Sequence, residues 1–347
     1  MPRLKPLHLI GLFAAFLLSG CNMVLLSPSG DIAAQQRDIL LTSTWLMLLI
    51  IVPVIFLTLL FAWKYRASNT NAPYNPEWSH STMLELVIWA APLVIIIALG
   101  AITWVSTHQL DPYRPLDRIS EGRSVPENTK PLVIEAVAMD WKWLFIYPEQ
   151  GIATVNELAA PLDRPIAFRI TSTTMMNSLS IPALAGMIYA MPGMQTELHA
   201  VINKEGVYDG FSGNYSGAGF SHMRFKFHGL TDEDFNKWVA SNRSGTTLTR
   251  ATYLKLEQPS VNDPVQRFAS VDAGLYDAIL NRCVEDNRMC IKDMAAIDVK
   301  GGMGHAGTYN LATNDLLKRR IGLAMVEQKT YVGALCAPGT APAARTL

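Results

Sequence analysis

The segment "PLVIEAVAMDWKWLFIYP" (residues 131–148) decides the fold of the C-terminal two thirds of the chain. In its second half, large aromatic residues alternate with other types, and these are Trp141, Trp143, Phe145 and Tyr147. A repeat of two residues places alternate side chains on the same face of a β-strand. The pattern therefore predicts a strand with an aromatic stripe on one face.

Further segments downstream have the same strand character: "RPIAFRITST" (164–173), "MQTELHAVINKEG" (194–206) and "HMRFKFHGL" (222–230). Gly, Pro and Asn residues, which favour turns, separate these segments. Several short strands with turn signals over about 100 residues predict an antiparallel sandwich or barrel. We assign this domain to residues 125–250.

The remainder of the chain is predicted to be mainly helical. "TDEDFNKWVA" (231–240) opens with a Thr that suits an N-cap, and acidic residues fill the first turn. Residues 251–335 are expected to form a helical extension, and 336–347 a disordered tail. Cys283 and Cys290 would lie roughly 10.5 Å apart on a continuous helix, so a disulfide needs a turn between them. The sequence leaves this pairing open.

Two apolar runs precede the strands, at residues 40–63 and 83–105. Each is long enough to cross about 30 Å of hydrocarbon as a helix. They predict a transmembrane hairpin within an anchor at 21–110, with both outer ends on one side of the membrane. Lys64 and Arg66 begin the connecting loop, and basic residues favour the cytoplasmic side.

The N-terminus resembles an export signal. Residues 1–20 have a basic start and a short apolar run, and they end in "LLSGC" (17–21). This pattern predicts a lipoprotein signal peptide whose cleavage leaves Cys21 as the acylated N-terminus, the alternative being a secretory peptide that ends near a cysteine. The domain after the second span is then expected in the periplasm, on a bacterial inner membrane. The formal net charge of zero gives no indication of nucleic-acid binding.

The two-helix anchor, "DWKW" (140–143), "NSLSIPAL" (177–184), "MPGMQTEL" (191–198) and the loop "SGNYSGAGFSHM" (212–223) follow one another in order. Together they resemble subunit II of the haem–copper respiratory oxidases, in particular the family of the bacterial cytochrome bo-type ubiquinol oxidases. The resemblance covers about residues 12–270. It implies a membrane-anchored α+β fold: a two-helix transmembrane hairpin, a cupredoxin-like Greek-key β-sandwich and a mainly helical C-terminal extension.

In the cytochrome c oxidase branch of this family, the same loop carries a binuclear copper centre. Thiolates bridge the two metal ions, and imidazoles with a weak thioether complete the ligand set. The resemblance places other residue types at these positions: Asn177 and Phe220 for the His ligands, Ser212 and Ser216 for the Cys ligands, Asn214 for the Glu and Met223 for the Met. Since a serine hydroxyl is neither soft nor acidic enough to bridge copper, we predict no metal in this chain.

The resemblance implies a subunit without a redox cofactor in a proton-translocating ubiquinol oxidase. Haem b, haem o and copper are then expected in subunit I, ubiquinol as the substrate of the complex, and subunit I, smaller membrane subunits and inner-membrane lipid as partners. Cytochrome c is not expected, because Tyr189 stands where its docking region would have an acidic residue. The aromatic stripe is expected to pack against subunit I.

Glu85 lies near the start of the second span. A carboxylate within an apolar span suggests a functional site. By resemblance it matches a Glu at the entry of a proton channel into subunit I. The alternative is an interfacial carboxylate that reaches the headgroups from the helix end.

Two other functions remain open. The chain could be a cytochrome c oxidase subunit II with a degenerate copper site, or a membrane-anchored copper-handling lipoprotein. A copper site could be rescued by His222 with a soft Cu(I) surface made by Met175, Met176, Met187, Met191 and Met194. The competing interpretation is that these methionines fill the sandwich core and a subunit interface.

Overall fold

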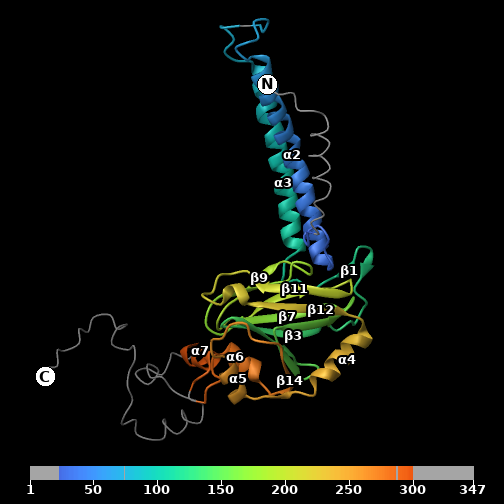
Figure 1. The fold of residues 1–347 in the computed structure, drawn as a ribbon, viewed down its shortest axis with the longest axis vertical. Helices are drawn as coiled ribbons and strands as arrows, with labels where there is room; N and C mark the ends of the chain where they lie inside the picture. The colour runs from blue at the N-terminus through green and yellow to red at the C-terminus, as the bar shows by residue number, and fades with distance from the viewer. Residues whose placement is uncertain (1–22, 74, 287, 300–347) are drawn as a thin grey trace, which may run out of the picture.

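The computed structural model describes residues 23–73, 75–286 and 288–299. The predicted leader, Cys21 and residues 300–347 lie outside this range. A helical hairpin stands on one side of a β-sandwich, and the C-terminal helices cover the other side (Figure 1).

The hairpin consists of α2 (Asp31–Lys64) and α3 (Thr82–Gln109), and each helix contains one predicted span. Both are long and apolar enough to cross a membrane, with mean hydropathies of 2.8 and 2.5 in their most apolar windows. No residue in either window is buried within the chain. Apolar side chains exposed along such helices require lipid or partner helices around them.

The sandwich has a seven-stranded and a five-stranded sheet. In sheet order, the first contains β10 (Thr196–Ala200), β7 (Ile166–Ser172), β3 (Leu132–Met139), β4 (Lys142–Tyr147), β5 (Ile152–Val155), β14 (Gln266–Val271) and β13 (Thr246–Leu248). The second contains β6 (Glu157–Pro161), β12 (Arg224–Leu230), β11 (Gly206–Ser212), β8 (Asn177–Ser180) and β9 (Met187–Ala190). A short β1–β2 ribbon (Arg118–Ser120, Arg123–Ser124) precedes them.

The predicted strands are present, but the sheets are mixed rather than purely antiparallel. β3 pairs with β7 in parallel, and β12 pairs with β6 in parallel. The reason is the path of the chain, which passes from the seven-stranded sheet to β6 in the other sheet and then returns as β7. Such crossings between sheets are typical of Greek-key sandwiches.

The aromatic stripe lies in the core, so its predicted role as an interface with subunit I is wrong for three of its members. Trp143, Phe145 and Tyr147 are completely buried between the sheets. The ring of Phe225 packs edge-on against Phe145, with 4.9 Å between ring centroids. Trp141 does not belong to the strand, because it occupies the turn between β3 and β4 with a φ of 75°.

The other face of β4 is buried as well. Leu144 and Ile146 pack into a second core with Tyr253, Phe268 and Ile279 from the C-terminal part of the chain. That part contains α5 (Arg250–Leu256), α6 (Leu275–Leu280) and α7 (Ile291–Val299), and it follows α4 (Asp232–Asn242), whose Thr231 N-cap is as predicted. Because β14 pairs with β5, the sheet continues past residue 250. The predicted boundary there divides one sheet.

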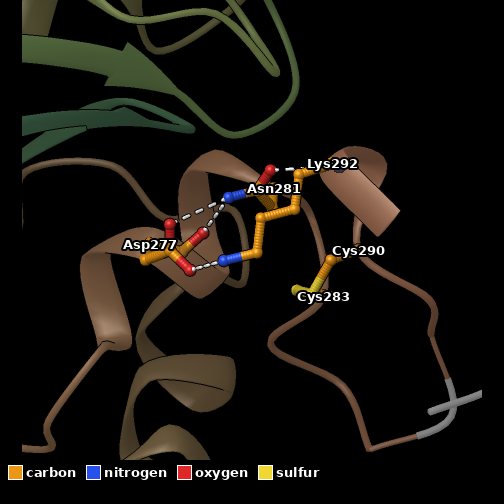
Figure 2. The surroundings of a disulfide bond; sticks show 5 residues. All are labelled: Asp277, Asn281, Cys283, Cys290 and Lys292. Carbon is orange, nitrogen blue, oxygen red and sulfur yellow. Dashed lines mark hydrogen bonds and ion pairs between the residues drawn. A yellow bond between two sulfur atoms is a disulfide. The ribbon is translucent and has the colours of Figure 1, made fainter. Parts of the chain in front are cut away.

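A disulfide joins Cys283 to Cys290 (Figure 2). The pairing that the sequence left open is possible because α6 ends at Leu280 and α7 begins at Ile291, so the cysteines lie in the turn between them. Asn281 supports the same turn, since its side chain accepts a hydrogen bond from the backbone N–H of Lys292.

The hairpin is fixed to the sandwich by the start of α2. The buried carboxylate of Asp31 forms a bidentate ion pair with Arg118, with N–O distances of 2.8 and 3.1 Å. The N–H of Gly30 donates to the carbonyl of Ala183 at 2.9 Å. A Cβ at Gly30 would lie 2.5 Å from the carbonyl oxygen of Leu184, so only glycine allows this close approach.

Two buried tyrosine hydroxyls provide a test of the packing. The hydroxyl of Tyr147 donates to the carbonyl of Ala159 at 2.8 Å and accepts from its N–H at 2.9 Å. The hydroxyl of Tyr276 is buried with no hydrogen-bond partner among the described residues. Replacing Tyr147 by Phe should lower the free energy of unfolding by about 1–3 kcal/mol, because it leaves buried backbone groups unpaired. Tyr276→Phe should leave it unchanged or raise it.

Urea unfolding of the full chain in detergent, followed by tryptophan fluorescence, measures both values. Equal losses for the two variants would contradict the assigned hydrogen bonds.

A carboxyl group on the outer face of the seven-stranded sheet predicts a pH dependence of stability. Burial raises the pKa of Glu135 to about 7, against the opposing charge of Arg169 on the neighbouring strand. The native fold thus favours the protonated form. This stabilisation is complete below the pKa of the unfolded chain and is lost as the pH rises through about 7.

Glu135→Gln should therefore gain stability relative to the wild type as the pH is raised from about 5 to about 8. Urea midpoints measured across that range give the difference between the two chains. A difference that stays constant with pH would contradict the assignment.

Candidate functional site

The loop at residues 212–223 connects β11 to β12 at one end of the five-stranded sheet. The N–H of Ser212 donates to the carbonyl of Met223 at 3.1 Å, which closes the loop at its base. The N–H of Gly213 donates to the Oγ of Ser178 on β8 at 2.9 Å. The structure therefore brings the loop and Asn177, which begins β8, into the same place, as the resemblance implies.

Hydrogen bonds hold together the positions that bear ligands in the copper-containing branch. The Oγ of Ser212 donates to the Oδ1 of Asn177 at 3.1 Å, and both side chains are buried. The Nδ2 of Asn214 donates to the carbonyl of Met176 at 2.9 Å. Met223 is buried as part of the sandwich core. Neutral polar groups thus fasten the loop to β8.

The side chain of Trp141 packs against the loop. Its Nε1 donates to the carbonyl of Ser216 at 3.0 Å. A Cβ at Gly219 would lie 2.5 Å from the indole ring, and Gly217 has a φ of 113°, so both glycines are needed for this approach. The sequence pattern placed Trp141 in a strand face and missed this role. Trp141 has a φ of 75°, which the turn requires. The alternation of residue types along the sequence gives no indication of this backbone angle.

The remaining ligand positions are Phe220 and Ser216, with His222 beside them. Phe220 begins a short 3-10 turn (Phe220–His222) and packs edge-on against the ring of Tyr215, with 5.6 Å between centroids. Ser216 is buried, and its Oγ has no hydrogen-bond partner among the described residues. His222 is exposed to solvent.

The donor set does not fit a binuclear copper centre. Thiolate bridges require sulfur, and the two bridging positions carry the hydroxyls of Ser212 and Ser216. The positions of the imidazoles carry an amide and a phenyl ring, at Asn177 and Phe220. Within residues 23–73, 75–286 and 288–299, no three His, Cys, Asp or Glu side chains are arranged to hold a metal ion. The arrangement is a hydrogen-bonded turn rather than an electron-transfer site.

The methionines beside the loop form an exposed surface, not a core. Met187 and Tyr189 project from β9, and Met187 contacts Gly213 of the loop. We call this surface the methionine patch; its members are between 42% and 74% exposed and are Met175, Met176, Met187, Tyr189, Met194 and Tyr215. The prediction that these methionines fill the sandwich core is wrong, because their strand and loop positions point away from the opposite sheet. Met191 is half-buried.

Glu85 is separate from this site. It lies in the first turn of α3, with its side chain exposed, at the end of the hairpin away from the sandwich (Figure 1). The loop, on the sandwich, and Glu85 are thus separated by the length of the hairpin (Figure 1).

Comparisons with known proteins give matches to two family models. A family model described as cytochrome c oxidase subunit II, periplasmic domain, matches residues 149–229, and one described as COX aromatic rich motif matches residues 243–287. The second match covers most of the segment that forms the outer core. Among solved structures, the periplasmic domain of subunit II of cytochrome oxidase from Bradyrhizobium japonicum is 23% identical, with a TM-score of 0.31, over 32% of this chain and 91% of that one.

Curated relatives match over more of the chain. Cytochrome bo(3) ubiquinol oxidase subunit 2 of Pseudomonas aeruginosa is 52% identical over 274 residues, which is 79% of this chain and 80% of that relative. Ubiquinol oxidase subunit 2 of Acetobacter aceti is 49% identical over 271 residues, 78% of this chain and 86% of that relative.

The hairpin, the cupredoxin-like sandwich and the family-model match define the class as subunit II of the haem–copper oxidases. Within that class, the chain belongs to the family of ubiquinol oxidase subunit 2. The resemblance seen in the sequence is confirmed, and the two alternative functions are not favoured.

If this loop differs from a copper-binding loop only in its side chains, replacing those side chains by the copper ligands should produce copper binding. We expect the full chain to bind no copper pair. The variant with Asn177→His, Ser212→Cys, Asn214→Glu, Ser216→Cys and Phe220→His should bind one, because the backbone of the loop is already in place. Metal analysis and near-infrared absorption after incubation with copper test both chains.

A variant that carries the His and Glu substitutions without the two Cys substitutions is the matched control and should show no such absorption. A mixed-valence dicopper signal from the unmodified chain would contradict the prediction.

Proposed function

We propose that this chain is the non-redox subunit II of a proton-translocating terminal ubiquinol oxidase. The complex would couple quinol oxidation to the reduction of O2 to water in an aerobic respiratory chain. The observation that carries the proposal is the donor set at residues 177 and 212–223, which offers copper no thiolate and no imidazole at the ligand positions. The names of the relatives, which are ubiquinol oxidase subunits, support it.

A subunit of this kind would not receive electrons from a soluble protein. The methionine patch beside the loop presents thioethers and aromatic rings, including Tyr189 where a cytochrome c docking region would be acidic. Docking of a basic cytochrome depends on complementary charge. A quinol reaches its oxidation site by diffusing in the membrane, so it needs no such surface. We therefore propose ubiquinol, not cytochrome c, as the electron donor of the complex.

The redox centres would all lie in subunit I. We assign haem b, haem o and copper to that subunit, and the present chain would supply none of their ligands. Its own contribution would be structural: the hairpin offers exposed apolar faces on both helices, and the methionine patch offers an apolar surface on the sandwich. Flexible thioethers adapt well to a partner surface.

Because the aromatic stripe is buried, we propose that the methionine patch takes its place as the contact with subunit I. Figure 1 shows β9, which carries part of the patch, on the side of the sandwich next to the hairpin. A membrane-embedded partner that surrounds the hairpin would also reach this side. The smaller membrane subunits would contact the remaining faces of α2 and α3.

The proposed location is the bacterial inner membrane, with the sandwich in the periplasm. The basic residues Lys64 and Arg66 at the far end of the hairpin support a cytoplasmic loop. Acylation of Cys21 would add lipid chains to the new N-terminus on the periplasmic side. Both assignments rest on sequence patterns.

Glu85 is proposed as the entry of a proton path into subunit I. It lies at the end of α3 that would face the cytoplasm, from which protons are taken up. Its side chain is exposed on the hairpin surface and so is available to a partner. A carboxylate at this level of an otherwise apolar helix suits a role in proton uptake.

Purification of the intact complex tests the proposal. We expect this chain to co-purify with a large haem-bearing membrane subunit, all haem and copper to partition with that subunit, and the complex to oxidise ubiquinol but not reduced cytochrome c. Optical spectra, metal analysis and oxygen consumption give these results. Turnover with cytochrome c, or copper that remains with this chain, would refute the proposal.

Glu85→Ala should lower the steady-state quinol oxidase turnover several-fold, since it removes the carboxylate that would collect protons. Glu85→Asp, which keeps the carboxylate, should recover part of the rate. The matched control is Glu77→Ala, which removes an exposed carboxylate from the loop that precedes α3. Wild-type turnover in Glu85→Ala would remove the assignment.

A further inference from the structure

A hollow of about 590 Å³ lies between the ends of α2 and α3 that adjoin the sandwich. Its walls change character along the helices. Toward the membrane they are apolar, with Ile39, Ala101, Ile102 and Val105. Toward the sandwich they are polar and charged, with Gln35, Arg37, Asp38, Gln109, Arg118 and Glu121. This change falls where a membrane-spanning hairpin leaves the hydrocarbon for the headgroup layer.

Part of the charged end is held in place by the fold. Arg118 is fixed by its bidentate ion pair with Asp31, whose side chain is 4% exposed. Arg37 donates to Asp38 at 2.6 Å. Glu121 is exposed at the rim. The hollow therefore presents guanidinium and carboxylate groups side by side at the level of the headgroups.

The balance of charge selects among ligands. Arg37 and Arg118 contribute two positive charges, while Asp31, Asp38 and Glu121 contribute three negative charges, which leaves one net negative charge. A purely anionic headgroup would meet like charge. A zwitterionic headgroup with an ammonium next to its phosphate complements both signs, with the phosphate at the arginines and the ammonium at the surplus carboxylate.

The polar end continues into a second hollow of about 430 Å³ between the base of the hairpin and the sandwich. Asp31, Gln35, Gln109 and Arg118 line both. The added walls of the second hollow carry the charged residues Asp111, Arg114 and Asp117 among apolar residues such as Leu116 and Leu198. The joined space is thus apolar at its membrane end and lined by charged, polar and apolar groups together toward the sandwich, so a charged headgroup could lie beyond the acyl chains.

We propose that this hollow is a binding site for one zwitterionic phospholipid with a primary ammonium headgroup, taken from the leaflet on the sandwich side. Its acyl chains would lie along Ile39, Ile102 and Val105. Its phosphate would contact Arg37 and Arg118, and its ammonium would contact Glu121. The inference requires only that the hairpin spans a bilayer and does not depend on the proposed redox role.

Filling the apolar end provides the first test. In the intact complex, Ile102→Trp should abolish retention of the phospholipid, because the indole occupies the space of the acyl chain. Ile97→Trp is the matched control, since Ile97 lies on the same helix, is 63% exposed and does not line the hollow. Native mass spectrometry of the complex after release from phosphatidylethanolamine nanodiscs counts the retained lipid. Equal lipid counts in the two variants would overturn the proposal.

Reversing the surplus charge provides the second test, on an exposed residue whose replacement does not disturb folding. Glu121→Arg changes the net charge of the hollow from one negative to one positive. The retained lipid should then change from phosphatidylethanolamine to phosphatidylglycerol when the complex is equilibrated with vesicles containing equal amounts of both. Glu127→Arg, an exposed residue that does not line the hollow, should keep the wild-type preference.

The same preference in both charge variants would refute the assignment of the headgroup. The mass spectra could instead show that the hollow holds a covalently attached acyl chain or a segment of protein. That result would refute the lipid site itself. Quinol oxidase turnover is not a readout in either test, so these results stand apart from those that test the redox proposal.

Discussion

The structure depends on the burial of β4 on both of its faces. Trp143, Phe145 and Tyr147 fill the space between the sheets, while Leu144 and Ile146 face a second core made by the C-terminal segment. A strand buried on both faces is set in register from both sides, since a slip of one residue would exchange the two cores. The seven-stranded sheet is therefore the middle layer of a three-layer domain. This is why the segment after residue 250 is part of the fold and not an appendage.

The loop at residues 212–223 is closed by hydrogen bonds and packing, without metal ligands. Backbone bonds between Ser212 and Met223, the Ser212–Asn177 contact and the indole of Trp141 hold it against β8. Such bonds each contribute about 0.5–1.5 kcal/mol, far less than a metal cluster, but together they retain the turn. The local structure of the loop therefore does not require a metal ion.

The sequence predicted the hairpin, most of the strands and the helix after Thr231, because each has a local signal of period or capping. It placed Asn177 and the loop together only through resemblance. Its errors have physical causes. A period of two shows that Trp143, Phe145 and Tyr147 share a face but not whether a second sheet or a partner covers that face. The strand β14 has no alternation that distinguishes it from a loop, and it forms because β5 offers it an open edge. The exposure of the methionines depends on which face of β9 meets the other sheet.

The disulfide between Cys283 and Cys290 determines at which stage of maturation the second core can form completely. Cys283 is itself a member of the second core, so the covalent bond and the packing of that core are coupled. Thiols remain reduced in the cytosol, and such bonds form in oxidising compartments. A chain inserted with its sandwich on the wrong side would therefore lack this closure. If the sandwich is exported, as proposed, formation of this disulfide would follow export and would complete the second core only in that orientation.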